Sequence, residues 1–257
     1  SLLSATARLF LIPKNRRSPS SPGGQTPVHS GPNSNPGSMG KTIYKNLPNI
    51  ASILGFLPIG FLLLEDGYQF LIPLIVYNNF MDDLDGVLAA KLNLKSNLGA
   101  VLDNVCDAVT HTLFVLAIGM HFGGICAIAS VAATVAMMLR VVSRLVDPPP
   151  NGRGSPTNEL VRHLFFVLLL TEIFSFNPVP FLIATFILHS LTMLVPFSMP
   201  YMVRSRSKTA TAIGLVNLTL VIAWLVPQAT PIVAFCFVIT YLASFFVGGF
   251  RWLKESK

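Results

Sequence analysis

The sequence predicts an all-α, polytopic membrane helix bundle with about eight transmembrane helices, and six as the lower bound. Three observations support this fold class: 52% of the 257 residues are hydrophobic, only 11% are charged, and the mean hydropathy is +0.63. These values are atypical of soluble globular domains. The apolar stretches are also long enough to cross a bilayer, which takes about 20 residues in a helix.

Residues 1–40 differ in composition from the rest of the chain. They are rich in Ser, Pro, Gly and Asn, and no Asp or Glu precedes Glu65. Such a segment buries too little apolar surface to fold, so we expect a disordered tail. Its acid-free, Arg- and Ser-containing character also resembles an organellar targeting segment. The first methionine is Met39, so a natural start there is an alternative. The integral-membrane domain is expected at 41–257.

Eight apolar segments follow, and each is expected to form one helix. They are 46–64, 68–91, 97–120, 124–146, 159–175, 178–199, 208–226 and 230–251. The shortest, 159–175, contains Arg162 and His163, and we retain it because its loss would invert the orientation of everything downstream.

Basic side chains fall at every second connection between these segments, and this alternation sets the expected orientation. The positive-inside rule then places both termini in the cytoplasm. The bases are explained by topology and by anionic headgroups, so no nucleic-acid partner is expected. They are Lys41, Lys45, Lys91, Lys95, Arg153, Arg162, Arg204, Arg206, Lys208, Arg251, Lys254 and Lys257.

Five of the eleven acidic side chains lie between residues 82 and 107. A carboxylate at membrane depth costs about 2.5–3.5 kcal/mol, so a cluster calls for divalent cations, a phosphate-bearing ligand, or both. Asp82 and Asp85 are three residues apart, and Asp103 and Asp107 are four apart. Each pair therefore shares one helix face. The predicted topology puts both pairs at the cytoplasmic ends of their helices.

The fifth acid of this stretch, Asp83, points to another face of its helix. We expect it to be solvated or to act as a cap. His163 and His189 have no apparent partners in the sequence and are expected to be structural. His111, one turn beyond Asp107, is expected either to hydrogen-bond that carboxylate or to pack between helices.

The spacing from Asp82 to Asp107, D-x2-D-G-x2-A-A-x8-G-x3-D-x3-D, resembles the signature of the CDP-alcohol phosphatidyltransferases. Seven of the eight motif positions match. The exception is Ala90, where the family has an arginine expected to help hold the anionic substrate. Lys91 or Lys95 could compensate. Both an active variant and a loss of activity stay open at this position.

The resemblance implies that a CDP-linked lipid, CDP-diacylglycerol, gives its phosphatidyl group to a small alcohol and releases CMP. Asp82, Asp85 and Asp103 would hold Mg²⁺ or Mn²⁺, hard cations that prefer oxygen ligands. Asp107 would serve as general base or as a second-metal ligand. The residues expected to bind the CDP-lipid are Gly86, Ala89, Lys91 and Gly99.

Resemblances to particular subfamilies suggest the acceptor, and serine is the first choice. Lys91-Leu92-Asn93 and Met138-Leu139-Arg140 resemble segments of phosphatidylserine synthases. Ser207-Lys208-Thr209 instead resembles an element of phosphatidylglycerophosphate synthases, so glycerol 3-phosphate, phosphatidylglycerol and inositol phosphate stay open as acceptors. The residues expected to contact the acceptor or lipid headgroups are Arg140, Arg144, Arg204 and Lys208.

Two other functional classes compete with this interpretation. Intramembrane carboxylates also mark ion-coupled transporters, although here they gather at one membrane face rather than at the midplane. A non-catalytic paralogue that binds lipid or nucleotide is the other alternative, because of Ala90. The expected location is a bacterial inner membrane, or an organellar membrane if the N-terminal tail is native. The resemblance also suggests a homodimer.

Overall fold

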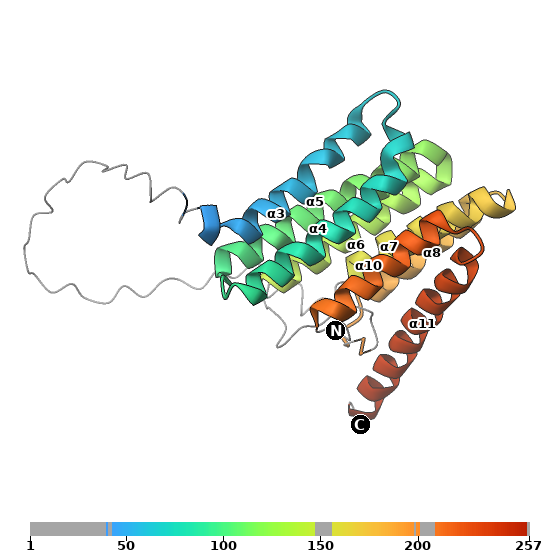
Figure 1. Ribbon diagram of the computed structural model, residues 1–257. Helices are drawn as coiled ribbons and strands as arrows, with labels where there is room; N and C mark the ends of the chain where they lie inside the picture. Colours follow the sequence, from blue (N-terminus) through green and yellow to red (C-terminus); the bar gives the residue numbers. More distant parts are fainter. Residues whose placement is uncertain (1–39, 41–42, 147–155, 198, 201–208, 256–257) are drawn as a thin grey trace, which may run out of the picture. The chain divides into compact units, whose positions relative to one another are not determined.

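A computed structural model describes residue 40 and residues 43–146, 156–197, 199–200 and 209–255 (Figure 1). Apart from Gly40, the N-terminal segment expected at 1–40 lies outside these residues. Eight α-helices of ten or more residues occur in the described part, and no strand. They are α3 (Leu47–Phe56), α4 (Leu71–Lys91), α5 (Asn97–Phe122), α6 (Gly124–Val146), α7 (Pro156–Phe174), α8 (Val179–Met193), α10 (Ala210–Leu225) and α11 (Thr230–Glu255).

These helices occupy the eight apolar segments predicted from the sequence, so the all-α membrane bundle is confirmed. For α6 the predicted and observed bounds coincide at 124–146. The first segment is not a single α-helix. It continues from α3 as a 3₁₀ helix, η2 (Leu57–Leu63), with Pro58 in its first turn. Proline has no backbone N–H to continue an α-helical ladder, which accounts for the change. A second 3₁₀ turn, η3 (Gly67–Phe70), leads into α4.

The helices differ in whether their length and composition suit them to cross a membrane. Helices α5 and α11, and α6 over Gly124–Ser143, are long and apolar enough to cross a membrane. The segments Leu47–Leu63, Val179–Met193 and Ala210–Leu225 are apolar but shorter. Helices α4 and α7 are long enough but carry charged side chains, among them Asp82 and Arg162. The chain is an integral membrane protein whose two most polar helices carry the buried charges described below. The orientation of the termini stays a prediction.

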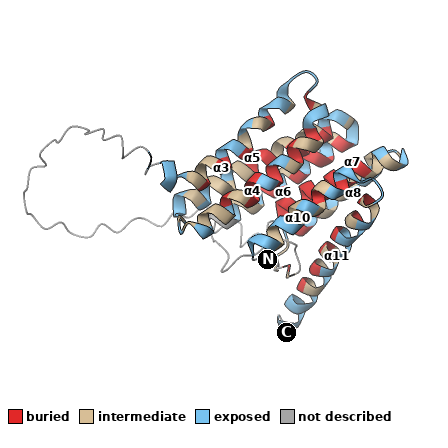
Figure 2. Cartoon of the chain, viewed as in Figure 1, coloured by how far each residue is buried: buried red, intermediate tan, exposed pale blue. Residues whose placement is uncertain are grey.

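The helices carry both buried and exposed residues (Figure 2). The core cluster includes Phe114 of α5, Met137 of α6 and Phe186 of α8, all fully buried. Large apolar side chains also stand outside, such as Phe250, which is 72% exposed. A membrane protein presents such side chains to lipid. Every residue from 156 to 166 of α7 is buried, because α7 packs against α4, α5, α8 and α11.

The connection between α4 and α5 positions the acidic stretch. Helix α4 ends where Asn93 adopts a positive φ of 55° and Leu94 N–H donates to the Ala89 carbonyl, at 3.0 Å. A left-handed residue just past a helix end is a common helix stop, and asparagine tolerates it. Helix α5 then begins at the Ser96 N-cap, whose Oγ accepts from Gly99 N–H at 3.0 Å. This short turn brings the last turns of α4 beside the first turns of α5.

Candidate metal centre

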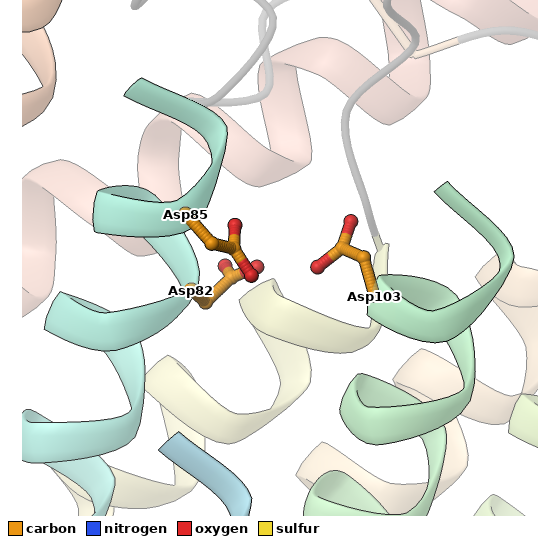
Figure 3. Close-up of side chains that lie close together, drawn as sticks. All are labelled: Asp82, Asp85 and Asp103. Atoms are coloured by element: carbon orange, nitrogen blue, oxygen red, sulfur yellow. The ribbon is translucent and has the colours of Figure 1, made fainter. Parts of the chain in front are cut away.

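Three carboxylates from two helices converge at this turn (Figure 3). Asp82 and Asp85 lie on one face of α4, as their spacing predicted, and Asp103 faces them from α5. One oxygen of each lies within 4.8 Å of the others. Asp82 and Asp85 are buried, each about one-twentieth exposed, and Asp103 is partly exposed. Three like charges at this separation repel one another unless a cation or a proton neutralises them.

Two neutral side chains orient these carboxylates. Ser52 of α3 donates its hydroxyl to Asp85 Oδ2. Asn158 of α7 donates from Nδ2 to Asp82 Oδ2 at 2.9 Å. A hydroxyl and an amide fix the direction of a carboxylate without cancelling its charge. The donor set consists of hard oxygen atoms, which fits Mg²⁺ or Mn²⁺ and does not fit a metal that prefers sulfur.

Asp107, the fourth carboxylate of the motif, is not part of this three-residue group. It lies one turn after Asp103 on α5 and is partly exposed. Its expected roles as general base or second-metal ligand therefore stay predictions.

The two motif glycines have different surroundings. Among the described residues, no heavy atom lies within 4 Å of a Cβ built on Gly86, and the residue is exposed. A Cβ on Gly99 would lie 2.9 Å from Asn49 Oδ1 of α3 and 3.0 Å from Ser96 Oγ. The Asn49 and Ser96 side chains thus occupy the space beside Gly99, whereas the described residues leave open space at Gly86. Substrate binding by Gly99 stays a prediction, and helix packing already accounts for it.

Three further motif residues lie along the last turns of α4. Ala89 is partly exposed, and Ala90 and Lys91 are exposed. A side chain at position 90 therefore has access to solutes or headgroups. Lys91 lies in the last turn of α4, where the helix dipole favours a cation.

Asp83 is not solvated, and that expectation is wrong. It is 6% exposed and accepts a hydrogen bond from Asn217 Nδ2 of α10 at 2.7 Å. Asn217 Oδ1 accepts in turn from Asn79 Nδ2 at 2.6 Å. Asn79 Oδ1 then accepts from Arg162 Nε and Nη2, at 3.0 and 2.8 Å. Asp83 is buried because α10 packs on this face of α4, which the sequence does not show.

Arg162 likewise differs from the role that the sequence suggested. It was counted among the basic loop residues, but it is 2% exposed inside α7 and pairs with Glu159 at 3.2 Å. Buried charges in proteins are paired, and Glu159 supplies the partner one turn away on the same helix. The Arg162 side chain consequently lies in the interior of the helix bundle and does not anchor lipid headgroups.

His163 and His189 also have partners that the sequence did not reveal. Their Nδ1 and Nε2 atoms are 2.8 Å apart, between α7 and α8. The interpretation that they lack partners is wrong. Polar residues inside apolar segments are a recognised signal of function or pairing. That signal could have marked Asn79, Asn158 and Asn217 as well, but not which helices they join.

The residues expected to contact the acceptor are only partly described. Arg140 is partly exposed on α6. Arg144 lies one turn further along the same helix, and its side chain is outside the described part. Arg204 and Lys208 lie outside the described residues altogether. The acceptor site therefore stays a prediction.

Comparison with known proteins supplies the family. An uncharacterized protein of Aquifex aeolicus (strain VF5) is 32% identical over 82 residues, which span 31% of this chain and 42% of that protein. The match thus covers less than half of the relative. Residues 45–247 match the family model described as CDP-alcohol phosphatidyltransferase, and this range includes the three converging carboxylates. The chain belongs to the CDP-alcohol phosphatidyltransferase family.

Proposed function

We propose that this protein transfers the phosphatidyl group of a CDP-linked lipid, CDP-diacylglycerol, to the hydroxyl of a small alcohol and releases CMP. The observation that carries the proposal is the convergence of Asp82, Asp85 and Asp103, within 4.8 Å of one another and within the family match. The activity belongs to phospholipid synthesis.

The carboxylates define the chemistry of the centre. Asp82, Asp85 and Asp103 would hold Mg²⁺ or Mn²⁺. When bound, such a cation would neutralise charge on the phosphate oxygens of the donor. Ser52 and Asn158 keep two of the carboxylates turned toward this point by hydrogen bonding. The open space at Gly86 would admit the nucleotide beside the carboxylates.

Asp107 would act as the general base. The acceptor oxygen forms a bond to the phosphorus next to the lipid, and the bond from that phosphorus to the bridging oxygen of CMP breaks. CMP leaves with the electron pair. The proton of the acceptor hydroxyl passes to the Asp107 carboxylate and then to water.

Serine is the proposed acceptor, with glycerol 3-phosphate, phosphatidylglycerol and inositol phosphate as the alternatives. Arg140 and Arg144, with Arg204 and Lys208, would bind the anionic group of the acceptor or of lipid headgroups. The site would face the cytoplasm, where these small acceptors are dissolved. The assembly would be a homodimer in a bacterial inner membrane or an organellar membrane.

Ala90 supports a second candidate, a protein that binds the CDP-lipid without turnover. The position is exposed, so the family's arginine would have room there and its loss removes a cation from the substrate side. Restoring it by Ala90→Arg should raise CMP release if the protein is an impaired enzyme. An unchanged or lower rate would indicate a site adapted to alanine.

CMP release tests the proposal directly. Purified protein is assayed in mixed micelles with CDP-diacylglycerol and Mg²⁺ or Mn²⁺. We expect it to release CMP with one of four acceptors: serine, glycerol 3-phosphate, phosphatidylglycerol or inositol phosphate. Chelation of the cation should stop the release. CDP-lipid binding that depends on the cation, without CMP release for any acceptor, would favour the binding-only candidate. If the protein neither binds the CDP-lipid nor releases CMP, both the enzyme proposal and the binding-only candidate are overturned.

A further inference from the structure

A carboxylate that the proposed transfer reaction does not use, Glu172, lies near the end of α7. Asn158, which contacts Asp82, lies fourteen residues earlier on the same helix, so Glu172 is about 21 Å further along the helix axis. Glu172 is exposed, and no salt bridge joins it to another described residue. Its charge is therefore not paired within the described part of the chain.

Glu172 lines a cavity of about 310 Å³ between α7, α10 and the first residue of α11. Trp224 of α10 lines the same cavity and is 36% exposed. The remaining lining residues are Leu169, Ile173, Ala223, Pro227 and Thr230. The Thr230 hydroxyl already donates to the Ala223 carbonyl, at 2.6 Å. The cavity thus combines one carboxylate and one indole with mostly apolar walls, and the exposure of both side chains opens it to the exterior of the bundle.

The charges near Glu172 are of one sign. Glu172 also lines a second cavity, of about 260 Å³, together with Tyr68 of η3, so the connection from η2 to α4 lies at this end of α7. That connection carries Glu65 and Asp66. The connections from η2 to α4, from α7 to α8 and from α10 to α11 contain no Lys or Arg. The local charge therefore favours a cationic ligand over an anionic one.

The lining of the cavity indicates which kind of cation fits. A hard metal ion takes about six oxygen ligands, and this cavity offers one carboxylate. An ammonium group needs less, because its N–H groups donate to one carboxylate and its charge is attracted to the face of an indole. Tryptophan also concentrates at the edges of membranes, where its ring meets lipid headgroups.

We propose that the cavity between α7 and α10 binds the ammonium group of a lipid headgroup. The Glu172 carboxylate accepts from the ammonium, the Trp224 indole lies beside it, and the apolar walls contact the carbon atoms of the lipid. This site is separate from the carboxylates of the metal centre and does not depend on the proposed transfer activity.

Tryptophan fluorescence tests this assignment. The chain has two tryptophans, so Trp252→Phe leaves Trp224 as the only one. Dihexanoyl phosphatidylethanolamine, added to this variant in detergent micelles, is expected to change the Trp224 emission saturably. The same lipid with its amine acetylated, and free ethanolamine, should not do so at the same concentration. An equal response to the acetylated lipid would overturn the ammonium as the recognised group, and an equal response to ethanolamine would overturn the lipid.

Two further substitutions in the Trp252→Phe background test the carboxylate. Glu172→Gln keeps the shape of an exposed side chain and removes its charge, so affinity for the lipid should fall about fivefold. Glu65→Gln is the matched control, because Glu65 is an exposed acid near the same end that does not line the cavity. It should bind the lipid as Trp252→Phe does, and thermal unfolding should show that both variants fold. Unchanged affinity in Glu172→Gln, or an equal loss in both variants, would contradict the role of Glu172.

Discussion

Helix α4 presents two neighbouring aspartates to two different environments. Asp82 joins a group of three carboxylates whose described donors, Asn158 and Ser52, are neutral. Asp83, the next residue, is joined through the amides of Asn217 and Asn79 to the cation Arg162. The described donors to the first group are uncharged, whereas the second network contains the cation Arg162. The two neighbouring aspartates thus differ in their described partners and not in their burial, which is nearly equal.

The largest expected effect comes from breaking the buried ion pair of the second network, Arg162 with Glu159. Arg162→Leu leaves Glu159 as a buried carboxylate without its ion-pair partner. Breaking a buried pair in this way costs about 3–5 kcal/mol of stability. Thermal unfolding in micelles should show the loss, while Mn²⁺ affinity of the folded fraction stays unchanged. Arg251→Leu, at an exposed position of α11, is the control and should unfold like the wild type.

The double variant Arg162→Leu with Glu159→Leu tests whether the pair is the cause. Removing both partners should recover part of the stability, because Glu159 no longer remains as a buried charge without its ion-pair partner. Additive losses in the double variant would contradict an ion pair as the source of the effect.

Removing one charge from the group of three carboxylates should instead lower activity. Asp103→Asn keeps the shape of a partly exposed side chain but deletes one of three carboxylates. We expect CMP release to fall about 10²–10³-fold, the range for losing one preorganised electrostatic group, with little change in unfolding temperature. Asp66→Asn, at an exposed position before η3, is the matched control. Activity at the wild-type level in Asp103→Asn would remove this residue from the centre.

The two asparagines that contact neighbouring aspartates, Asn158 and Asn217, give the sharpest comparison. Asn158→Ala removes the donor to Asp82, and Asn217→Ala removes the donor to Asp83. Residues that orient a metal ligand are worth about 10–100-fold in affinity or activity. Titration with Mn²⁺ should therefore show weaker binding for Asn158→Ala only. Asn217→Ala should lower the unfolding temperature and leave Mn²⁺ affinity intact. If both variants weakened Mn²⁺ binding equally, the proposed difference between the Asp82 and Asp83 environments would be contradicted.

The smallest effects are expected at the motif glycines. Gly86→Ala places a methyl group in open space, so stability should be unchanged while the KM for CDP-diacylglycerol rises. Gly99→Ala brings its Cβ to 2.9 Å from Asn49 Oδ1, the end of a partly exposed side chain that can rotate away, so the loss of stability should stay below the range of about 1–3 kcal/mol for core overpacking. Steady-state kinetics and thermal unfolding of both variants distinguish these outcomes. A stability loss in Gly86→Ala without a kinetic effect would contradict substrate approach at that residue.

Much of the site could be predicted because helical spacing is local. Asp82 and Asp85 share a face by their three-residue separation, and a short turn marked by Asn93 and Ser96 returns the chain to Asp103. The failures concern residues whose partners lie far along the sequence. Asp83 meets Asn217, 134 residues away, and His163 meets His189, 26 residues away. No periodicity within one helix indicates which other helix covers a given face.

The sequence by itself determined the all-α membrane class, the positions of the eight helices and the membership of Asp82, Asp85 and Asp103 in one motif. Hydropathy and helical periodicity depend on residues within one turn or one membrane span, so they can be recognised in the sequence alone. The tertiary structure alone decided which polar groups are satisfied from within the chain. Packing of α7 and α10 against α4 brings Asn158 to Asp82 and Asn217 to Asp83. The reason is that the hydrogen-bond partners of a side chain on one helix face come from the helix that packs on that face.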